Sequence, residues 1–171
     1  MSHYEIERKY LIRYPDVAVL EKQPYFEKVG ISQSYLEQGP EGESRRVRKS
    51  VMNGKIIYQY NEKVPVTLER RIESEKEITK AEYEAYLAQK DPSTITINKT
   101  RYRIFENGFC YEIDLFPFWK SQAFLEVEVK DESVTYPIPP YIQILRDVTE
   151  DPSYTNHALS FKIPPETLQD G

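Results

Sequence analysis

The chain has 171 residues, of which 39% are hydrophobic and 30% are charged, so it has enough apolar material for a globular core. Its formal net charge of -5 argues against a general nucleic-acid binder, because such proteins usually carry a basic excess. A charged N-terminus without a long apolar run argues against a secretion signal or a membrane span, and the single cysteine, Cys110, cannot form an internal disulfide. We therefore expect a cytoplasmic protein with no membrane or nucleic-acid partner.

The elements expected along the chain are mostly strands. They cover residues 3–12, 31–37, 43–51, 55–63, 67–78, 94–105, 109–116 and 123–130. Asn53-Gly54 and Asn107-Gly108 each predict a hairpin, because this dipeptide suits two-residue turns. The capping-box pattern at residues 79–82 predicts a helix that ends near residue 89. Short helical pieces are expected between Pro137 and residue 160.

This pattern predicts a mainly β fold, of the α+β kind, in a single domain over residues 1–171. The core is expected over about residues 3–160, and residues 161–171 are expected to form a loose tail. Tight turns make neighbouring strands antiparallel, and about eight such strands can close into a barrel or tunnel that is wide enough for a small ligand. We expect a polar, charged interior with a few helices packed on the outside.

The charged interior is inferred from ionic residues that stand two positions apart, because side chains alternate between the faces of a strand. The basic residues on the expected inner face are Lys9, Arg46, Arg48, Lys63, Lys99, Arg101 and Arg103. The acidic residues on it are Glu5, Glu7, Glu73, Glu75, Glu112, Asp114, Glu126 and Glu128. Any one pair also fits a solvated outer face with cross-strand ion pairs, but the recurrence of the pattern favours a lined cavity.

The two signs of charge are largely segregated by strand, which predicts a cationic wall and an anionic wall. Arginine guanidinium groups match the oxygens of a polyphosphate. Clustered carboxylates suit a hard divalent cation, Mg²⁺ or Mn²⁺, which keeps waters and bridges to phosphates. A water held by the metal or by a carboxylate can then attack a phosphorus atom.

The charged segments, together with the neutral segment at residues 32–36, also follow a familiar order along the chain. They are Glu5-Ile6-Glu7-Arg8-Lys9, Ser32-Gln33-Ser34-Tyr35-Leu36, Arg46-Val47-Arg48, Lys63, Glu73-Ser74-Glu75, Lys99-Thr100-Arg101-Tyr102, residues 111–116, residues 125–129 and residues 147–156. This order resembles the short bacterial members of the CYTH superfamily, the triphosphate tunnel metalloenzymes. The resemblance implies an eight-stranded antiparallel tunnel that binds a small-molecule triphosphate and one or two divalent ions, and it is compatible with a homodimer.

The resemblance also implies a role for each group of residues. Those that would hold phosphates are Lys9, Arg46, Arg48, Lys63, Lys99 and Arg101, and Arg103 fits the same alternation. Those that would bind metal, directly or through water, are Glu5, Glu7, Asp114, Glu126 and Glu128, to which the acidic face adds Glu112. Glu73 and Glu75 would orient a water or order the basic wall, and Lys99 would neutralise a leaving oxygen.

These expectations favour a metal-dependent triphosphatase that cleaves the terminal phosphoanhydride of inorganic tripolyphosphate or of an organic triphosphate. Two alternatives stay open: an adenylate cyclase of the class IV type, which makes cyclic AMP from ATP, and a non-catalytic polyphosphate-binding module. Among the remaining residues, Cys110 is expected to be a buried structural thiol, and His3 and His157 are expected to be surface or capping residues. Trp119 is expected to pack internally or, alternatively, to stack on a ring of the substrate.

Overall fold

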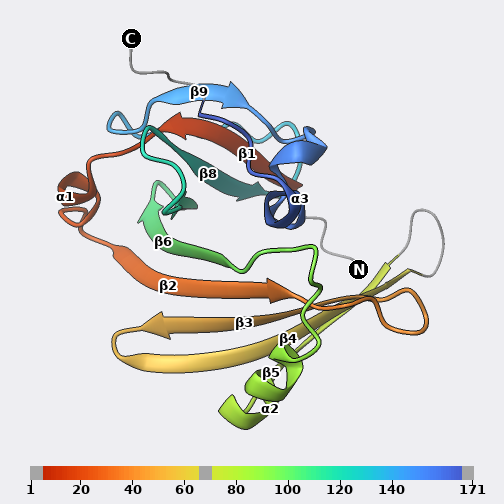
Figure 1. The fold of residues 1–171 in the computed structure, drawn as a ribbon. Coiled ribbons are helices and arrows are strands. Elements are labelled where there is room, and N and C mark those ends of the chain that lie inside the picture. Colours follow the sequence, from red (N-terminus) through yellow and green to blue (C-terminus); the bar gives the residue numbers. More distant parts are fainter. Residues whose placement is uncertain (1–5, 66–70, 167–171) are drawn as a thin grey trace. The chain divides into compact units, whose positions relative to one another are not determined.

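The computed structural model describes residues 6–65 and 71–166, and their elements are traced in Figure 1. The strands are β1 (Ile6–Arg13), β2 (Phe26–Tyr35), β3 (Ser44–Met52), β4 (Lys55–Pro65), β5 (Arg71–Ile78), β6 (Ile97–Glu106), β7 (Phe109–Leu115), β8 (Gln122–Val129) and β9 (Ile144–Asp147). The helices are α1 (Val17–Leu20), α2 (Lys80–Leu87), a 3₁₀ turn, η1 (Pro152–Tyr154), and α3 (Asn156–Phe161). The predicted mainly β, antiparallel fold is confirmed.

The strands form one sheet in the order β5-β4-β3-β2-β6-β7-β8-β1-β9. This sheet has nine strands, so the prediction of eight was wrong. The additional strand is β9, which pairs with β1. Its residues lie in the part of the chain, between Pro137 and residue 160, where we expected only short helical pieces. Among the described strands the order ends at β5 and at β9, so the sheet is open and the expected closed tunnel is not confirmed.

The chain divides into two compact units, and the chain crosses between them within β2, within β6, after Tyr154 and after Ile163. We call them unit 1, which comprises the described residues 6–29, 99–154 and 164–166, and unit 2, which comprises 30–65, 71–98 and 155–163. Each unit has its own hydrophobic cluster. The single-domain expectation stays a prediction.

The core of unit 1 lies on one face of β6, β7 and β8. Its buried members include Tyr102, Ile104, Tyr111, Ile113, Leu115, Leu125, Val127 and Val129. They alternate with the charged residues of the same strands, as the period of a strand requires. Leu20 of α1 and Ile142, in the segment before β9, complete this cluster. The apolar faces are therefore covered partly by irregular chain and not by helices alone.

The core of unit 2 lies between α2 and the strands β3 and β4. Val47 of β3 is fully buried, and the rings of Tyr83 and Tyr86 on α2 contact those of Tyr58 and Tyr60 on β4, with centroids 4.9 Å and 4.6 Å apart. The predicted capping box of α2 is present, because the side chains of Thr79 and Glu82 each bond the other residue's backbone N–H. Helix α2 thus packs on the apolar face of the strands, as expected.

Both predicted Asn-Gly hairpins are present. Asn53 and Gly54 have φ angles of 52° and 78°, and Asn107 and Gly108 have φ angles of 54° and 78°. Two successive residues with positive φ fit the twist of the flanking strands. These turns fix the register of β3 against β4 and of β6 against β7. In the second pair Arg101 lies opposite Asp114, and Arg103 lies opposite Glu112. In the first pair Arg46 and Arg48 lie opposite neutral amides of β4.

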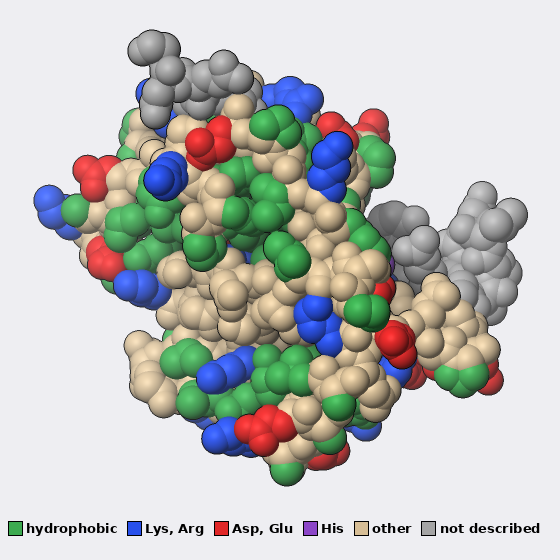
Figure 2. All heavy atoms as spheres, viewed as in Figure 1, with side chains coloured by type: hydrophobic (Ala, Val, Ile, Leu, Met, Phe, Trp, Pro, Cys, Tyr) green, Lys and Arg blue, Asp and Glu red, His purple; other side chains and the backbone are tan. Residues whose placement is uncertain are grey.

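The surface is chemically mixed. On the face shown in Figure 2, basic and acidic side chains are scattered among hydrophobic and neutral ones. None of the helices in the described part of the chain is long and apolar enough to cross a membrane.

Candidate functional site

The charged face of unit 1 is enclosed instead of being solvated. It carries five ionic side chains that are less than a tenth exposed: Lys9, Lys99, Arg101, Asp114 and Glu126. Burying an unpaired charge is costly, so such groups require partners of opposite sign. The interpretation of this face as an ordinary wet surface with ion pairs is therefore wrong for these residues.

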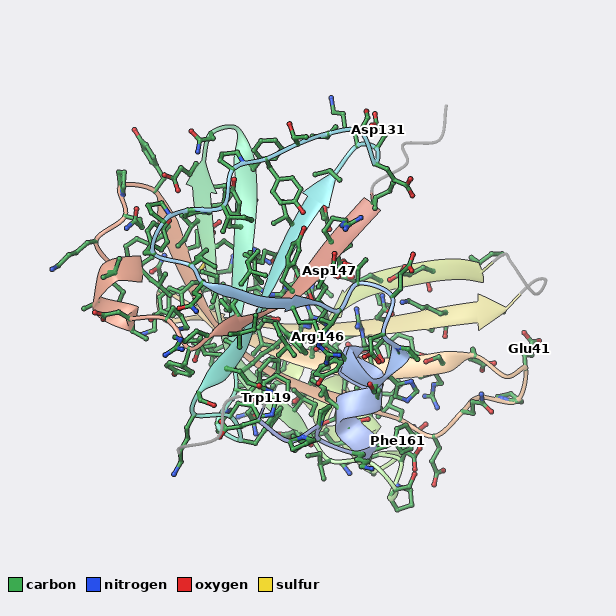
Figure 3. The ribbon with its side chains drawn as sticks, turned by 90° about the horizontal axis from the view of Figure 1, so that it is seen from above. Glu41, Trp119, Asp131, Arg146, Asp147 and Phe161 are labelled. Atoms are coloured by element: carbon green, nitrogen blue, oxygen red, sulfur yellow. The ribbon has the colours of Figure 1, made fainter. Side chains whose placement is uncertain are left out.

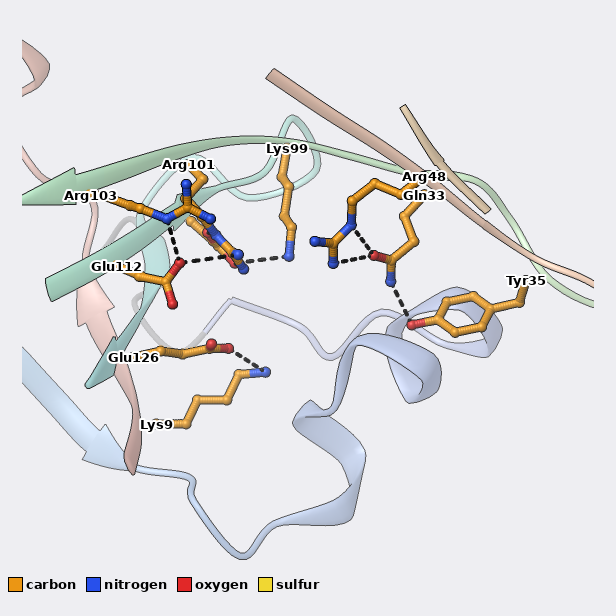
Figure 4. A network of polar contacts seen from close by, with 10 residues as sticks. Lys9, Gln33, Tyr35, Arg48, Lys99, Arg101, Arg103, Glu112 and Glu126 are labelled. Atoms are coloured by element: carbon orange, nitrogen blue, oxygen red, sulfur yellow. Dashed lines mark hydrogen bonds and ion pairs between the residues drawn. The ribbon is translucent and has the colours of Figure 1, made fainter. Parts of the chain in front are cut away.

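Asp114 is the centre of an ionic network on this face, and Figure 4 labels its partners Lys99 and Arg101. Lys99 Nζ donates to its Oδ2 over 2.9 Å, and Arg101 donates from Nε to Oδ1 over 2.8 Å and from Nη2 to Oδ2 over 3.0 Å. Burial alone would raise the pKa of Asp114, but Lys99 and Arg101 outweigh it and hold that pKa well below its usual range. Asp114 therefore stays ionised and acts as the counterion of two cations.

The network continues along the β6–β7 hairpin toward its Asn107-Gly108 turn. Glu112 Oε2 accepts from Arg103 Nε over 3.1 Å and forms an ion pair with Arg101 Nη1, also at 3.1 Å. In this structure two of the predicted metal ligands, Glu112 and Asp114, thus pair with three of the predicted phosphate-binding cations. Such pairing fixes the orientation of the Lys and Arg side chains and neutralises part of their charge.

The acidic residues of β1 and β8 form a different arrangement. Glu7 lies opposite Glu128, and Lys9 opposite Glu126, in the register of the two strands. Lys9 Nζ is 3.4 Å from Glu126 Oε1 and lies 4.1 Å from the centre of the Phe124 ring. Three carboxylates, those of Glu7, Glu126 and Glu128, therefore accompany one lysine in this part of the strand register.

Glu7 responds to that excess of negative charge. Burial raises the pKa of Glu7 to about 7, and repulsion from Glu126 and a hydrogen bond with it raise the pKa in the same direction. Carboxylates that crowd in this way fit a hard divalent cation, which would remove the repulsion. The described residues nevertheless hold no group of three acidic, His or Cys side chains already arranged as a metal site. Glu5 lies outside the described residues.

The charged face of unit 2 carries the remaining predicted residues. Arg46 and Arg48 lie on β3, Lys63 on β4, and Glu73 and Glu75 on β5. Lys63 is opposite Glu73 in the register of β4 and β5. Both glutamates are exposed and accept hydrogen bonds from neutral amides: Glu73 from Asn61 over 3.2 Å, and Glu75 from Gln59 over 2.8 Å.

Two neutral residues of unit 2 were given no site role by the reasoning from sequence, although residues 32–36 are part of the predicted resemblance. Gln33 and Tyr35 lie on β2 opposite Arg48 and Arg46, and the oxygen of the Gln33 side chain accepts two hydrogen bonds from Arg48 (Figure 4). Their spacing of two residues along a polar strand was the available signal. It was overlooked because only ionic residues were followed.

Similarity to solved structures agrees with this picture. No protein-family model and no curated protein matches the chain. The crystal structure of the inorganic triphosphatase NE1496 matches with 27% sequence identity and a TM-score of 0.65, covering 96% of this chain and 99% of that one. A second NE1496 structure, described as a hypothetical protein, matches equally well over 94% of this chain and 100% of that one.

The predicted resemblance to the CYTH superfamily is confirmed. The PH1819 protein from Pyrococcus horikoshii, at 23% identity and a TM-score of 0.51, covers 75% of this chain and 80% of its own, and it supports the fold alone.

The residues outside the CYTH pattern have clear positions. Trp119, labelled in Figure 3, lies between β7 and β8 and is only 2% exposed. Its ring contacts those of Phe116 and Phe124, and its Nε1 donates to Pro164 O over 3.0 Å. Internal packing of Trp119 is therefore confirmed, and stacking on a substrate is not. His157 is exposed, and its ring stacks on that of Tyr35. His3 lies outside the described residues.

Cys110 is half-buried, so the expectation of a buried thiol was too strong. It lines a cavity of about 700 Å³ in unit 1, together with Arg103, Phe105, Phe109 and Glu128. Burial, followed by repulsion from Glu112, raises the pKa of the Cys110 thiol to about 11. Because the thiolate is the reactive form, this environment does not favour a nucleophile.

Proposed function

We propose that the protein is a metal-dependent hydrolase that cleaves the terminal phosphoanhydride of inorganic tripolyphosphate or of an organic triphosphate. The observation that carries the proposal is the enclosed ionic face of unit 1, where a cationic network adjoins the crowded carboxylates of Glu7 and Glu126. The similarity to a triphosphatase of nearly the same extent supports it. A wholly structural ion network would leave no reason for the crowding of Glu7 and Glu126.

The basic residues of both units are assigned to phosphate binding. Lys9, Lys99, Arg101 and Arg103 belong to unit 1, and Arg46, Arg48 and Lys63 belong to unit 2. Guanidinium forks match phosphate oxygens, and fixed partners such as Asp114 and Glu112 keep Arg101 oriented before a substrate arrives. Lys99 is assigned the further role of neutralising the leaving oxygen.

The metal, Mg²⁺ or Mn²⁺, is assigned to Glu5, Glu7, Glu126 and Glu128, with Glu112 and Asp114 as further ligands when they exchange their partners. When bound, such an ion offsets the charge of the phosphates and acidifies an attacking water. Glu73 and Glu75 are assigned to orienting that water or to ordering the basic residues, in keeping with their hydrogen bonds to Asn61 and Gln59.

Three finer expectations stay part of the proposal. One is that the strands close into the tunnel that the CYTH resemblance implies. The second is that the protein acts in the cytoplasm on a small-molecule triphosphate. The third is that it forms a homodimer.

The deciding experiment is to incubate the protein with tripolyphosphate, ATP or thiamine triphosphate, each with Mg²⁺ and with Mn²⁺. We expect release of orthophosphate that stops when the metal is chelated. Formation of cyclic AMP and pyrophosphate from ATP would instead identify a cyclase, and binding without turnover would identify an anion-binding module.

A variant pair tests the assigned roles. Glu126→Gln is expected to lower turnover by more than about 100-fold, because loss of even a group that only hydrogen-bonds a metal ligand commonly costs 10–100-fold. Arg48→Ala is expected to raise KM by about 10–100-fold through loss of a charged hydrogen bond. The exposed Glu132→Gln serves as the matched control and should leave both constants unchanged. Unchanged turnover in Glu126→Gln would contradict the metal role.

A further inference from the structure

A buried amide on β2 holds one of the candidate phosphate-binding arginines. Gln33 is 0% exposed and lies opposite Arg48 of β3 in the strand register. Its Oε1 accepts from Arg48 Nε over 2.9 Å and from Arg48 Nη2 over 2.6 Å (Figure 4). Two bonds from one edge of the guanidinium to a single acceptor fix both the position of the group and the orientation of its plane.

The orientation of the amide is determined by chemistry. A guanidinium has only donors, so the oxygen of Gln33 must face Arg48 and its NH₂ group must face away. That NH₂ group donates to the hydroxyl of Tyr35 over 2.8 Å. The Gln33 side chain therefore cannot rotate without losing hydrogen bonds at both of its ends.

Tyr35 is itself held firmly. It is 5% exposed, and its ring stacks on that of His157 in α3, with centroids 4.4 Å apart and planes 21° from parallel. Burial raises the pKa of Tyr35, and the charge of Arg46, which lies opposite it in the register of β2 and β3, opposes that rise. Both arginines of the Arg46-Val47-Arg48 segment thus lie opposite one buried pair, Gln33 and Tyr35, within unit 2.

Burying the polar amide of Gln33 costs free energy, and a purely structural role does not explain why an amide occupies this position. A free arginine side chain has many rotamers, and holding it in one of them before a ligand arrives reduces the entropy lost on binding. A core position could instead be filled by an apolar residue, with no need to satisfy a buried amide. The bonds to Arg48 and Tyr35 are what this amide provides.

We propose that Gln33, supported by Tyr35, is a positioning residue that presents the Arg48 guanidinium to the phosphate groups of the substrate. This inference rests on the proposed triphosphatase function. It goes beyond that function by assigning a role to two neutral residues that do not belong to the ionic pattern.

The first test is Gln33→Met, which keeps the length of the side chain and removes both hydrogen-bonding groups. We expect KM for tripolyphosphate to rise about tenfold while kcat changes less than about threefold, because the lost interaction serves binding. The control is Ser34→Ala on the same strand, which removes a buried hydroxyl bonded to Thr96 and should leave KM unchanged. An unchanged KM in a folded Gln33→Met protein would overturn the proposal.

The second test is a double-mutant cycle with Arg48→Ala. If Gln33 acts through Arg48, Gln33→Met should change KM by less than twofold once Arg48 is absent. If the KM of the double variant rises by the product of the two single-variant increases, the residues act independently and the proposal is overturned. If Gln33→Met does not fold, Tyr35→Phe takes its place in the cycle, since it removes only the hydroxyl and keeps the ring on His157. We expect Tyr35→Phe to raise KM two- to fivefold. This rise should again be lost in the Arg48→Ala background.

The outcome also separates this inference from the proposed function. Absence of hydrolysis by the wild-type protein contradicts the function alone. Calorimetric titration of tripolyphosphate into the same variants then measures Kd in place of KM, with the same expected ratios. Equal Kd values for the wild type and Gln33→Met would overturn the role of Gln33.

Discussion

The carboxylates of unit 1 differ in their electrostatic partners, although they look alike in the sequence. Asp114 receives three hydrogen bonds from Lys99 and Arg101, and its pKa is held below the usual range. Glu7 instead faces Glu126, and its pKa is raised. Neighbouring residues of one sheet face can thus provide a fixed counterion in one place and an excess of negative charge in another.

Asp114→Asn tests the counterion role. At pH 7 we expect the free energy of unfolding to fall by about 3 kcal/mol, because two buried cations lose their shared partner. The folded pKa of Asp114 lies below the unfolded value of about 3.9, so the unfolded chain binds more protons between the two values. The contribution is therefore complete above about pH 5 and is lost as the pH falls through the unfolded value toward the folded one.

Urea unfolding in the presence of a chelator, followed at pH 7 and at pH 3, measures this loss. The difference between Asp114→Asn and the wild type should shrink at pH 3, and the exposed Glu132→Gln should show little difference at either pH. A difference that is equally large at both values would contradict the ionised state of Asp114 in the folded protein.

Among the elements, helix α2 depends on local signals more than any strand does. The N–H groups at the start of a helix have no acceptor within the helix, and the capping box of α2 satisfies such groups. The tyrosine rings of α2 pack on those of β4 and hold the helix there. A helix of this length is marginal alone, so cap and packing must act together.

Thr79→Ala is expected to destabilise the protein by about 1 kcal/mol, because the cap of α2 loses its side-chain acceptor. In a chain of this size that corresponds to a fall in Tm of about 2–4 °C, which calorimetry resolves. Lys80→Ala, at the next exposed position, is the control and should shift Tm by less than 1 °C, as roughly expected for a surface change. Equal shifts in both variants would argue against the cap.

The elements also show where reasoning from sequence succeeds. The hairpins at Asn53 and Asn107 and the cap at Thr79 were predictable, because each depends on residues that are adjacent in the chain. Strand β9 was not, because its residues 144–147 become a strand by pairing with β1, far away in the sequence. Local propensity carries no information about such a partner.

The candidate site was predictable to a similar extent. The alternation placed Lys99, Arg101 and Asp114 on one face correctly. It could not reveal that Asp114 pairs with both cations, since a carboxylate occupies the same position in the alternation whether it binds a metal or a lysine. Gln33 was missed because a neutral side chain becomes informative only when its hydrogen-bond partners are known.

For the whole molecule, the proposed chemistry requires many charges at once, and this sets its dependence on pH. Protons compete with a divalent cation for carboxylates, and an attacking water loses its proton more easily in alkali. We expect the rate of tripolyphosphate hydrolysis to be greatest above pH 7 and to disappear with EDTA. Initial rates from pH 5 to pH 10 in saturating Mg²⁺ measure this, and a maximum below about pH 6, under the free histidine pKa, would contradict it.

The position of β1 has a consequence for how the chain is made. Strand β1 is synthesised before the other described strands, yet it lies between β8 and β9, so Ile6 pairs with Val129 and Tyr10 pairs with Asp147. Closing so long a loop is entropically slow compared with forming the β6–β7 hairpin. During translation, Leu11 and Ile12, both fully buried in the finished fold, must therefore remain without their strand partners until β8 and β9 have left the ribosome. In that interval this apolar segment is a natural target for a chaperone.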